Sequence, residues 1–471
     1  MLTFIICLVA LIIAYFTYGR YLQRVADTDP EKLCPSKRLA DGVDYITMPR
    51  WRVFLIQLLN IAGTGPIFGA ILGACFGPVA FLWITLGGIF FGAMHDYLSG
   101  MMILRADGRS LPEVLGIYLG SNIRQITRWF SILLLVLVGA VFILSPAELL
   151  ANLVPSVQST AWVWIILIYY IVATVLPVDK VIGRLYPIFG AALICMALGL
   201  LGVIIFENYS VPELSFHNYQ LNPIAMPIIP TLFITIACGA ISGFHATQSP
   251  MMARCVGNEK ECRAVFYGSM ISESIIALIW AAIAMAFFNG ATELGVALSG
   301  HGNNPAWAVD VISRTTLGKF GAILAILGVV AAPITSGDTA FRSARLIIAD
   351  MFGIEQKTLW RRFAICIPLF ALGYGITCVN FGVVWRYFAW ANQTLAAFTL
   401  WAIVVWLQRA GKPQWIGLIP AVAMTYIVVS FMFISNQFLG MGPTLAAYVL
   451  AGVITALPTY IILRNKQKVT L

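Results

Sequence analysis

Among the ionisable side chains inside long apolar stretches of this sequence are Asp96, His245, Glu273 and Asp338. A charged group is costly in lipid, so such residues usually face a cavity, a partner or a transport pathway. A buried carboxylate without a partner holds a proton more readily, and imidazole exchanges protons near neutral pH. We therefore predict proton coupling at Asp96, Glu273 and Asp338. His245 has a structural alternative, because a histidine beside a helix break can hydrogen-bond a freed carbonyl oxygen.

Two arginines follow Asp338 closely. Arg342 and Arg345 stand four and seven positions further on, so Asp338 and Arg342 can pair along one helix face. One interpretation is a structural ion pair at the membrane edge. The other is a coupling carboxylate with two arginines that act as a gate.

Polar and helix-breaking residues gather twice in mid-span. The first run is Gly-Thr-Gly-Pro at 63–66, and the second is Ser-Gly-Phe-His at 242–245, followed by Thr247 and Gln248. Glycine and proline weaken a helix, and proline suits the first turn of a new one. Irregular backbone at membrane depth needs protein or a water-filled cavity around it. We expect two interrupted helices that line a binding site, with close packing through small residues as the alternative.

The elements that must position these residues are transmembrane helices. The chain has 471 residues, of which 60% are hydrophobic and only 10% charged, a balance that no soluble domain of this size shows. Roughly 20 apolar residues cross a bilayer. We predict one all-α integral membrane domain over 1–471 with about thirteen spans, at 2–19, 53–75, 79–103, 129–150, 161–177, 185–206, 225–253, 264–288, 320–340, 363–380, 383–408, 414–435 and 443–463.

The basic residues indicate the orientation. With these spans, 26 of the 29 Lys and Arg residues fall in alternate loops on one side. The positive-inside rule then predicts an outer N-terminus and a cytoplasmic C-terminus. The net charge of +9 is explained by the inner leaflet of a bacterial inner membrane, without nucleic acid. Residues 1–19 lack a basic leader and a cleavage site, so we expect a retained helix rather than a signal peptide.

The two predicted interrupted helices are the second and seventh spans, five apart and opposite in direction. Interrupted helices at matching positions of inverted repeats are typical of secondary transporters. We expect repeat one at 53–206 and repeat two at 225–408, with peripheral helices at 1–19 and 414–463.

Several motifs resemble the carbon starvation protein A (CstA) family, in its shorter branch. They are NIAGTGPIFGAILGACFGP (60–78), HDYLSGM (95–101), DGRSLPEVLG (107–116), SGFHATQSPMMARC (242–255) and TSGDTAFRSARLI (335–347). The resemblance implies a place in the amino acid–polyamine–organocation superfamily with a LeuT-like core of five plus five helices. It also implies a proton-coupled importer of small organic nutrients, pyruvate or peptides.

A site can be assigned on this basis. The half-helix that begins at Pro66 directs backbone amides toward the midplane, where a carboxylate would bind. The candidate substrate-binding residues are Gly63, Thr64, Gly65, Pro66, Ser242, Gly243, Phe244, His245, Thr247, Gln248, Asn392 and Gln393. The candidate ion site, at the sodium position of a LeuT-like core, is formed by Ala62, Thr335, Ser336 and Thr339. The ion-pair and gating candidates are Arg342, Arg345 and Arg386, and Arg386 has the alternative of a snorkelling residue in an aromatic belt.

Three other classes are weighed against a proton-coupled transporter by alternating access. A sodium-coupled amino acid or peptide transporter fits the same features, and a passive channel can also use broken helices. An enzyme is disfavoured, since the chain has four His and no HExxH motif. We expect no cofactor and no metal site. The expected partners are a small-molecule substrate, a coupling proton or sodium ion, and the lipid bilayer, and the sequence sets no oligomeric state.

Overall fold

The computed structural model describes residues 1–41, 45–175, 178–207, 209–356 and 358–464, and over these ranges it is helical throughout with no strand. The first half contains α1 (Leu2–Phe16), α2 (Tyr18–Val25), α3 (Pro35–Arg38), α4 (Arg50–Ile61), α5 (Gly65–Ala74), α6 (Val79–Leu82), the π-helical η1 (Trp83–Ala93), α7 (Met94–Arg105), α8 (Leu111–Leu119), α9 (Ser121–Leu153), α10 (Ser159–Val175) and α11 (Val178–Phe206). The second half contains η2 (Ile228–Leu232), α12 (Phe233–Thr235), α13 (Gly243–Ala253), η3 (Glu259–Glu261), η4 (Arg263–Gly268), α14 (Ser269–Phe287), α15 (Ala291–Gly300), α16 (Pro305–Leu324), η5 (Ala325–Val330), α17 (Ala331–Phe352), α18 (Leu359–Thr377), α19 (Phe381–Arg409), α20 (Trp415–Ile434) and α21 (Leu445–Arg464).

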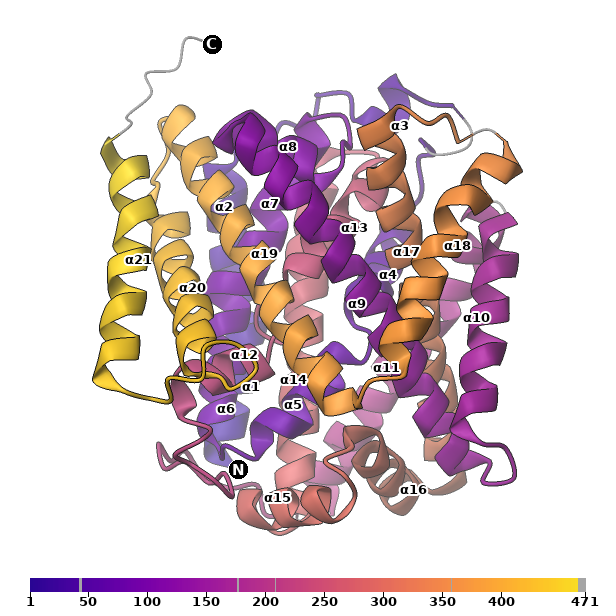
Figure 1. The fold of residues 1–471 in the computed structure, drawn as a ribbon, viewed down its shortest axis with the longest axis vertical. Coiled ribbons are helices and arrows are strands. Elements are labelled where there is room, and N and C mark those ends of the chain that lie inside the picture. Colours follow the sequence, from indigo (N-terminus) through magenta and orange to yellow (C-terminus); the bar gives the residue numbers. More distant parts are fainter. Residues whose placement is uncertain (42–44, 176–177, 208, 357, 465–471) are drawn as a thin grey trace.

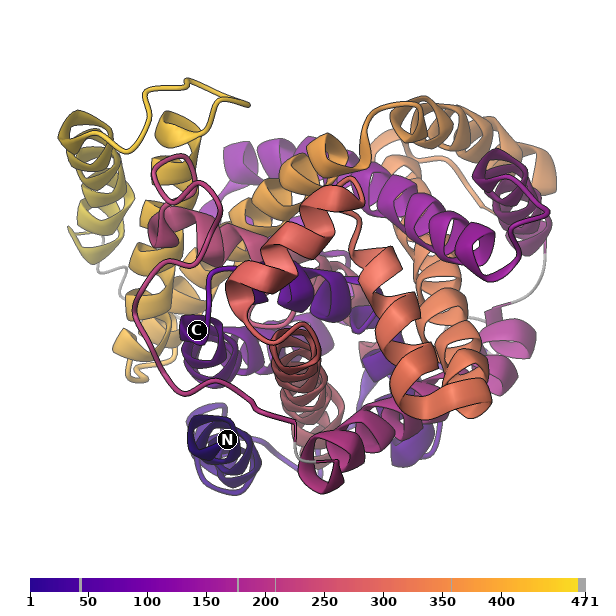
Figure 2. The ribbon, with the colours of Figure 1, turned by 90° about the horizontal axis from the view of Figure 1, so that it is seen from below.

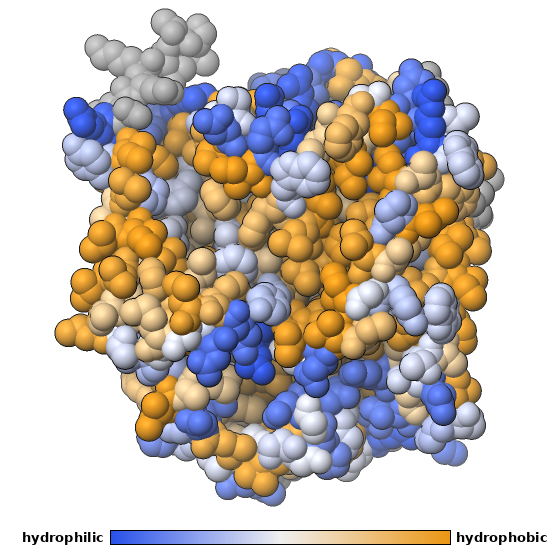
Figure 3. Space-filling view, in the orientation of Figure 1, coloured by the Kyte–Doolittle hydropathy of each residue, from blue (hydrophilic) through white to orange (hydrophobic). Residues whose placement is uncertain are grey.

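The long helices stand side by side as a bundle (Figure 1). Apolar side chains cover the middle of the visible face, and hydrophilic ones gather toward both ends (Figure 3). Large apolar residues on the outside, such as Leu198 and Val453, are 59% and 65% exposed. An apolar belt of this extent is typical of a surface that contacts lipid, so the protein is a multi-pass membrane protein.

Nine helices among the described residues are long and apolar enough to cross a membrane, and the bent pair α4–α5 adds a tenth. The predicted count of thirteen therefore remains a prediction. Several expected spans differ from a single helix of the expected length. The span at 161–177 is a shorter apolar helix, Ser159–Thr174, and its last two residues lie outside the described ranges. The span at 225–253 is divided among η2, α12 and α13, and the span at 320–340 among α16, η5 and α17.

The N-terminus and the end of α21 lie at opposite ends of the bundle (Figure 1). The end that holds α2, α3, α8 and the last turn of α21 is called here the basic end, because the predicted inner loops meet there. The opposite end carries α15 and α16. Seen along the bundle, α1 and α21 lie at its rim (Figure 2).

Both predicted helix breaks are present. α4 ends at Ile61 and α5 begins at Gly65, with a bend of 48° between them. Between α12 and α13 the chain leaves the helix from Ile236 to Ser242. The two interrupted helices are antiparallel neighbours, since Met48 N, just before α4, donates to Cys255 O, just after α13, at 3.1 Å.

The two breaks meet at the start of α5, where the backbone of Gly65 lies against Cys238. A Cβ atom at position 65 would come within 2.4 Å of Cys238 Sγ, which is less than any tolerable contact. Only glycine allows this approach. The polar backbone of each break is therefore surrounded by protein, as membrane depth requires.

The end of the ninth expected span is wrong by about three turns. α17 continues to Phe352, so Asp338 lies within this helix rather than at its inner end. The predicted span ended at 340 because charged residues start at Asp338. Asp338 and Arg342 pair along the helix, which allows the helix to continue through the interior.

A segment between α2 and α4, described over 26–41 and 45–49, covers the basic end; we call it the basic-end strap. Ser36 Oγ donates to Val256 O at 2.6 Å, and Tyr45 OH donates to Asp107 O at 2.9 Å. Beside it, Arg105 at the end of α7 forms a 2.9 Å ion pair with the buried Glu259 in η3. The strap thus joins the loops that follow α7 and α13.

Candidate functional site

Three side chains from different helices form a chain of ionisable groups in the interior. His245 Nδ1 on α13 lies 2.8 Å from Asp96 Oδ2 on α7. Its other ring nitrogen, Nε2, lies 3.3 Å from Glu273 Oε2 on α14. All three side chains are fully buried. We call Asp96, His245 and Glu273 the buried triad.

The imidazole is thus placed between two carboxylates. The second oxygen of Asp96, Oδ1, lies 2.8 Å from His95 Nδ1. Asp96 therefore has two imidazole partners, one on its own helix and one on α13. Both Glu273 oxygens lack a hydrogen bond of good geometry. Among the described residues, no group of three or more His, Cys, Asp or Glu is arranged to hold a metal ion.

Proton counting constrains the triad. A neutral imidazole has one N–H donor and one acceptor nitrogen, whereas an ionised carboxylate only accepts. If His245 were neutral and both carboxylates ionised, one ring nitrogen would present a lone pair to a carboxylate. In that state a ring nitrogen would carry its lone pair 3.3 Å from a Glu273 oxygen, and an additional proton on any of the three groups would relieve this contact.

The start of α13 is held by a residue that is distant in sequence. Asn392 Oδ1 on α19 accepts from Ser242 Oγ at 3.0 Å and from Phe244 N at 2.7 Å. This amide caps the first turn of α13, and such caps contribute about 1 kcal/mol. Gly243 packs directly on α19, since a Cβ there would lie 2.5 Å from Asn392 O. Ser242 and Asn392, both predicted to bind substrate, bind each other in this structure.

The first break is lined by an aromatic contact. Phe142 of α9 lies against the backbone of Gly63, where a Cβ would meet its ring at 2.7 Å. The same ring packs edge-on against Phe244, with centroids 6.0 Å apart. Thr64 Oγ1 lies 3.4 Å from Ser145 Oγ. Residues predicted from both breaks thus converge around Phe142.

The remaining predicted binding residues are buried and partly satisfied. Thr247 Oγ1 donates to Phe244 O at 2.6 Å and accepts from Gln248 Nε2 at 3.1 Å. Gln393 Nε2 donates to Phe233 O at 3.1 Å, on the other arm of the interrupted helix. The side-chain oxygens of Gln248 and Gln393 have no partner.

The candidate ion-site residues connect α17 to α4. Ser336 Oγ donates to Leu59 O, in the last turn of α4, at 3.0 Å and lies 2.9 Å from Ala332 O. Thr335 and Thr339 donate to carbonyls of their own helix, at 2.8 and 2.9 Å. Ser336 thus contacts the last turn of α4, three residues before Ala62, and the ion site itself stays a prediction.

Asp338 forms a separate ion pair. Its Oδ2 lies 3.4 Å from Arg342 Nη2, which also reaches Ala173 O at 3.3 Å. Arg345 is 6% exposed, and its Nε lacks a partner. Within the described residues, no hydrogen bond or ion pair connects this group to the buried triad. The third gating candidate, Arg386, is exposed and donates from Nε to Gly382 O of its own helix at 3.1 Å.

Two further polar residues were not assigned to the site from the sequence. Gln57 and Asn60 are fully buried in α4, and both polar atoms of each side chain lack a partner. They stand one turn apart in an apolar span, and two polar residues on one face of such a span could have indicated a buried polar site. Because α4 packs against α13, α14 and α17, these amides add unsatisfied donors and acceptors to the region of the breaks.

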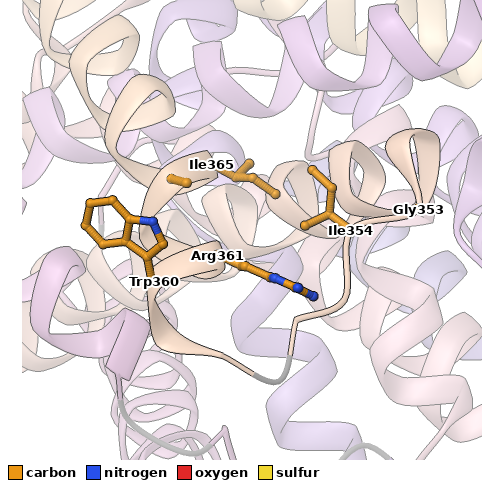
Figure 4. Close-up of a pocket in the computed structure, with 6 residues that line it drawn as sticks. Gly353, Ile354, Trp360, Arg361 and Ile365 are labelled. Atoms are coloured by element: carbon orange, nitrogen blue, oxygen red, sulfur yellow. The ribbon is translucent and has the colours of Figure 1, made fainter.

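A hollow at the basic end contains none of the predicted site residues. It is lined by Gly353 and Ile354 after α17 and by Trp360, Arg361 and Ile365 of α18 (Figure 4). Its position on the surface, away from both breaks, separates it from the candidate site.

The fold and this interior define a polytopic membrane protein with two antiparallel interrupted helices around buried ionisable groups. The sequence profile of carbon starvation protein CstA matches residues 1–157 and 146–317. The chain belongs to this family, as its motifs predicted.

Three relatives illustrate the family. An uncharacterised membrane protein of Haemophilus influenzae is 40% identical over 64% of this chain and 94% of its own length. The peptide transporter CstA of Escherichia coli is 25% identical over 87% of this chain and 77% of its own. The pyruvate/proton symporter BtsT of Escherichia coli is 26% identical over 57% and 46%. The relatives with named activities are transporters, which confirms that the chain is not an enzyme.

Proposed function

We propose that this protein is a proton-coupled secondary transporter that imports a small organic nutrient across the bacterial inner membrane by alternating access. The observation that carries the proposal is the buried triad, in which an imidazole joins two carboxylates from three different helices. Transport of pyruvate or of peptides is supported by two relatives, the peptide transporter CstA and the pyruvate/proton symporter BtsT of Escherichia coli.

The triad supplies a means of coupling. An added proton on one of its three groups would relieve the approach of a His245 ring nitrogen to the Glu273 carboxylate. Loss of that proton would drive α13 and α14 apart at this contact. Because α13 is one arm of an interrupted helix, a protonation change would bias the position of the binding region.

The antiparallel breaks support a LeuT-like arrangement of two inverted five-helix repeats, over 53–206 and 225–408. In this arrangement the N-terminal amides of α5 and the freed groups around Gly63, Thr64 and Ser242 bind the solute near the midplane. Thirteen spans with an outer N-terminus and a cytoplasmic C-terminus complete the proposed topology.

The test is concentrative uptake into proteoliposomes. An imposed pH gradient should drive accumulation of labelled pyruvate or of a labelled dipeptide above equilibrium. A sodium gradient at equal pH on both sides should drive none. Accumulation with sodium alone would favour the Ala62, Thr335, Ser336 and Thr339 site and overturn proton coupling. Equilibration without accumulation under either gradient would indicate a channel.

Two matched variants locate the coupling group. Glu273→Gln should equilibrate solute but no longer concentrate it, because the amide cannot release a proton. Glu355→Gln removes an exposed carboxylate paired with Arg361 at 3.7 Å and should behave as wild type. Normal proton-driven accumulation by Glu273→Gln would remove the triad from the mechanism.

A further inference from the structure

A cavity at the end of the bundle opposite the basic end offers a second site. We propose that it binds a primary ammonium group, such as the free amino terminus of a peptide or an amino acid, before the solute reaches the interior. The inference deepens the proposed transport function by naming a chemical class of solute, but binding in the cavity can be measured without transport.

The cavity has a volume of about 510 Å³ and lies among four elements. These are the end of α9, the start of α10, the loop between α15 and α16, and the loop between α18 and α19, all in the half of the molecule that holds the N-terminus (Figure 1). Its size suits a solute of two or three residues rather than a single ion.

The wall carries an acidic group and no basic one among its described residues. Among the described residues that line it, Glu148 is the one carboxylate, and there is no lysine or arginine. Asn304 hydrogen-bonds the carboxyl group, whereas Glu148 Oε2 is buried without a partner. A buried carboxylate oxygen of this kind favours a cationic donor over an anion.

The other groups complete an ammonium site. Trp164 and Tyr374 form an aromatic wall with ring centroids 4.6 Å apart, which attracts a cation through the ring faces. His301 Nδ1 lies 2.8 Å from Ala297 O, so Nδ1 is the donor and the neutral ring leaves Nε2 as an acceptor. An ammonium group has three N–H donors. Besides Glu148 and His301, the lining residues Ser159, Thr160 and Thr377 carry hydroxyl oxygens that can accept such donors.

An anionic solute finds no lysine or arginine among the described residues of this wall. Arg386, which was predicted to attract an anion at the outer side, donates to its own helix and does not line the cavity. A carboxylate such as that of pyruvate would instead face Glu148. The cavity therefore selects for an amino group, and a carboxylate on the same molecule must lie away from Glu148.

A native thiol reports on the cavity. Cys378 is exposed and lines it, so the rate of Cys378 alkylation by a maleimide measures occupancy in the purified full chain. Glycylglycine should slow this alkylation in a saturable way. N-acetylglycylglycine, pyruvate, and sodium or potassium chloride at equal concentration should not. The Cys378→Ser variant supplies the background, since Cys195 is also exposed.

Two variants test the assignment. Glu148→Gln should weaken protection by glycylglycine about tenfold, the loss of one charge-assisted hydrogen bond. Trp164→Leu should weaken protection by glycylglycine several-fold. Because Trp164 is exposed, this variant remains a valid test if Glu148→Gln does not fold. Unchanged protection in both variants overturns the proposal, as does equal protection by the acetylated dipeptide or by the salts. Proton-driven uptake can fail while protection persists, which separates this proposal from the transport proposal.

Discussion

The buried triad and the Asp338–Arg342 pair place the same chemical group, an aspartate carboxylate, in two different settings. Asp96 is fully buried and Asp338 is 5% exposed, so burial does not distinguish them. Their partners do. Asp96 faces imidazoles, a type of group that can exist with or without its extra proton, whereas Asp338 faces a guanidinium, which keeps its proton. The partner of a buried carboxylate therefore decides whether the carboxylate suits proton exchange or a permanent ion pair.

The largest effect should follow removal of the imidazole from the triad. His245→Leu leaves Asp96 and Glu273 facing an apolar side chain, and breaking a buried pair costs about 3 kcal/mol. We expect a clear fall in thermal stability together with loss of proton-driven uptake, measured by denaturation in detergent and by proteoliposome assay. His217→Leu, at an exposed histidine outside the bundle interior, should change neither. A stable, active His245→Leu protein would place the triad in the same structural class as the Asp338 pair.

The Asp338 pair should behave as a fixed structural unit. Asp338→Asn and Arg342→Gln each leave a partner without its counter-charge and should destabilise the protein by about 1–3 kcal/mol. The double variant should recover part of this loss, with a coupling energy of about 0.5–3 kcal/mol in a double-mutant cycle.

The transport readout sharpens the distinction. Uptake by the Asp338→Asn, Arg342→Gln double variant should remain driven by a pH gradient, because the triad is intact. If the double variant folds but no longer responds to the gradient, Asp338 carries the coupling proton and the comparison is reversed.

A smaller loss of stability is expected when the cap of α13, the helix that carries His245 of the buried triad, is removed. Asn392→Ala removes the acceptor for Phe244 N at the start of α13 and should cost about 1 kcal/mol. Because α13 carries His245, uptake should fall as well. Asn436→Ala, on the exposed loop after α20, is the control. A loss of stability without any change in uptake would show that the cap does not act on the triad.

The smallest effect concerns a carboxylate at the surface, outside both regions. Glu213 accepts from the Met1 ammonium and from Thr3, and these bonds lower the pKa of its carboxyl group from 4.5 to about 2. Its stabilising contribution is full above pH 4.5 and is lost as the pH falls toward 2. The melting temperatures of wild type and Glu213→Gln should differ at pH 7 and 5 and converge below pH 4. A constant difference over this range would contradict the assignment.

The sequence predicted the local features because they have local causes. Gly-Pro at 65–66 and the glycines at 239 and 243 mark the two breaks, and the apolar stretches mark the long helices. The convergence of Asp96 and His245, which are 149 positions apart, depends on how α7 and α13 pack, and no spacing rule contains that information. The cap of α13 by Asn392 was not predicted, for the same reason. A polar residue inside a span can line a cavity or can cap the end of a neighbouring helix, and the sequence does not distinguish the two.

The basic-end strap has a consequence for how the interior can communicate with that side. The strap hydrogen-bonds to the loops after α7 and α13, so the two helices that carry Asp96 and His245 are tied at their far ends by one stretch of chain. Under the proposed alternating access, opening toward this end would require these hydrogen bonds to break together, and the rate at which they break would limit how often the interior is exposed there.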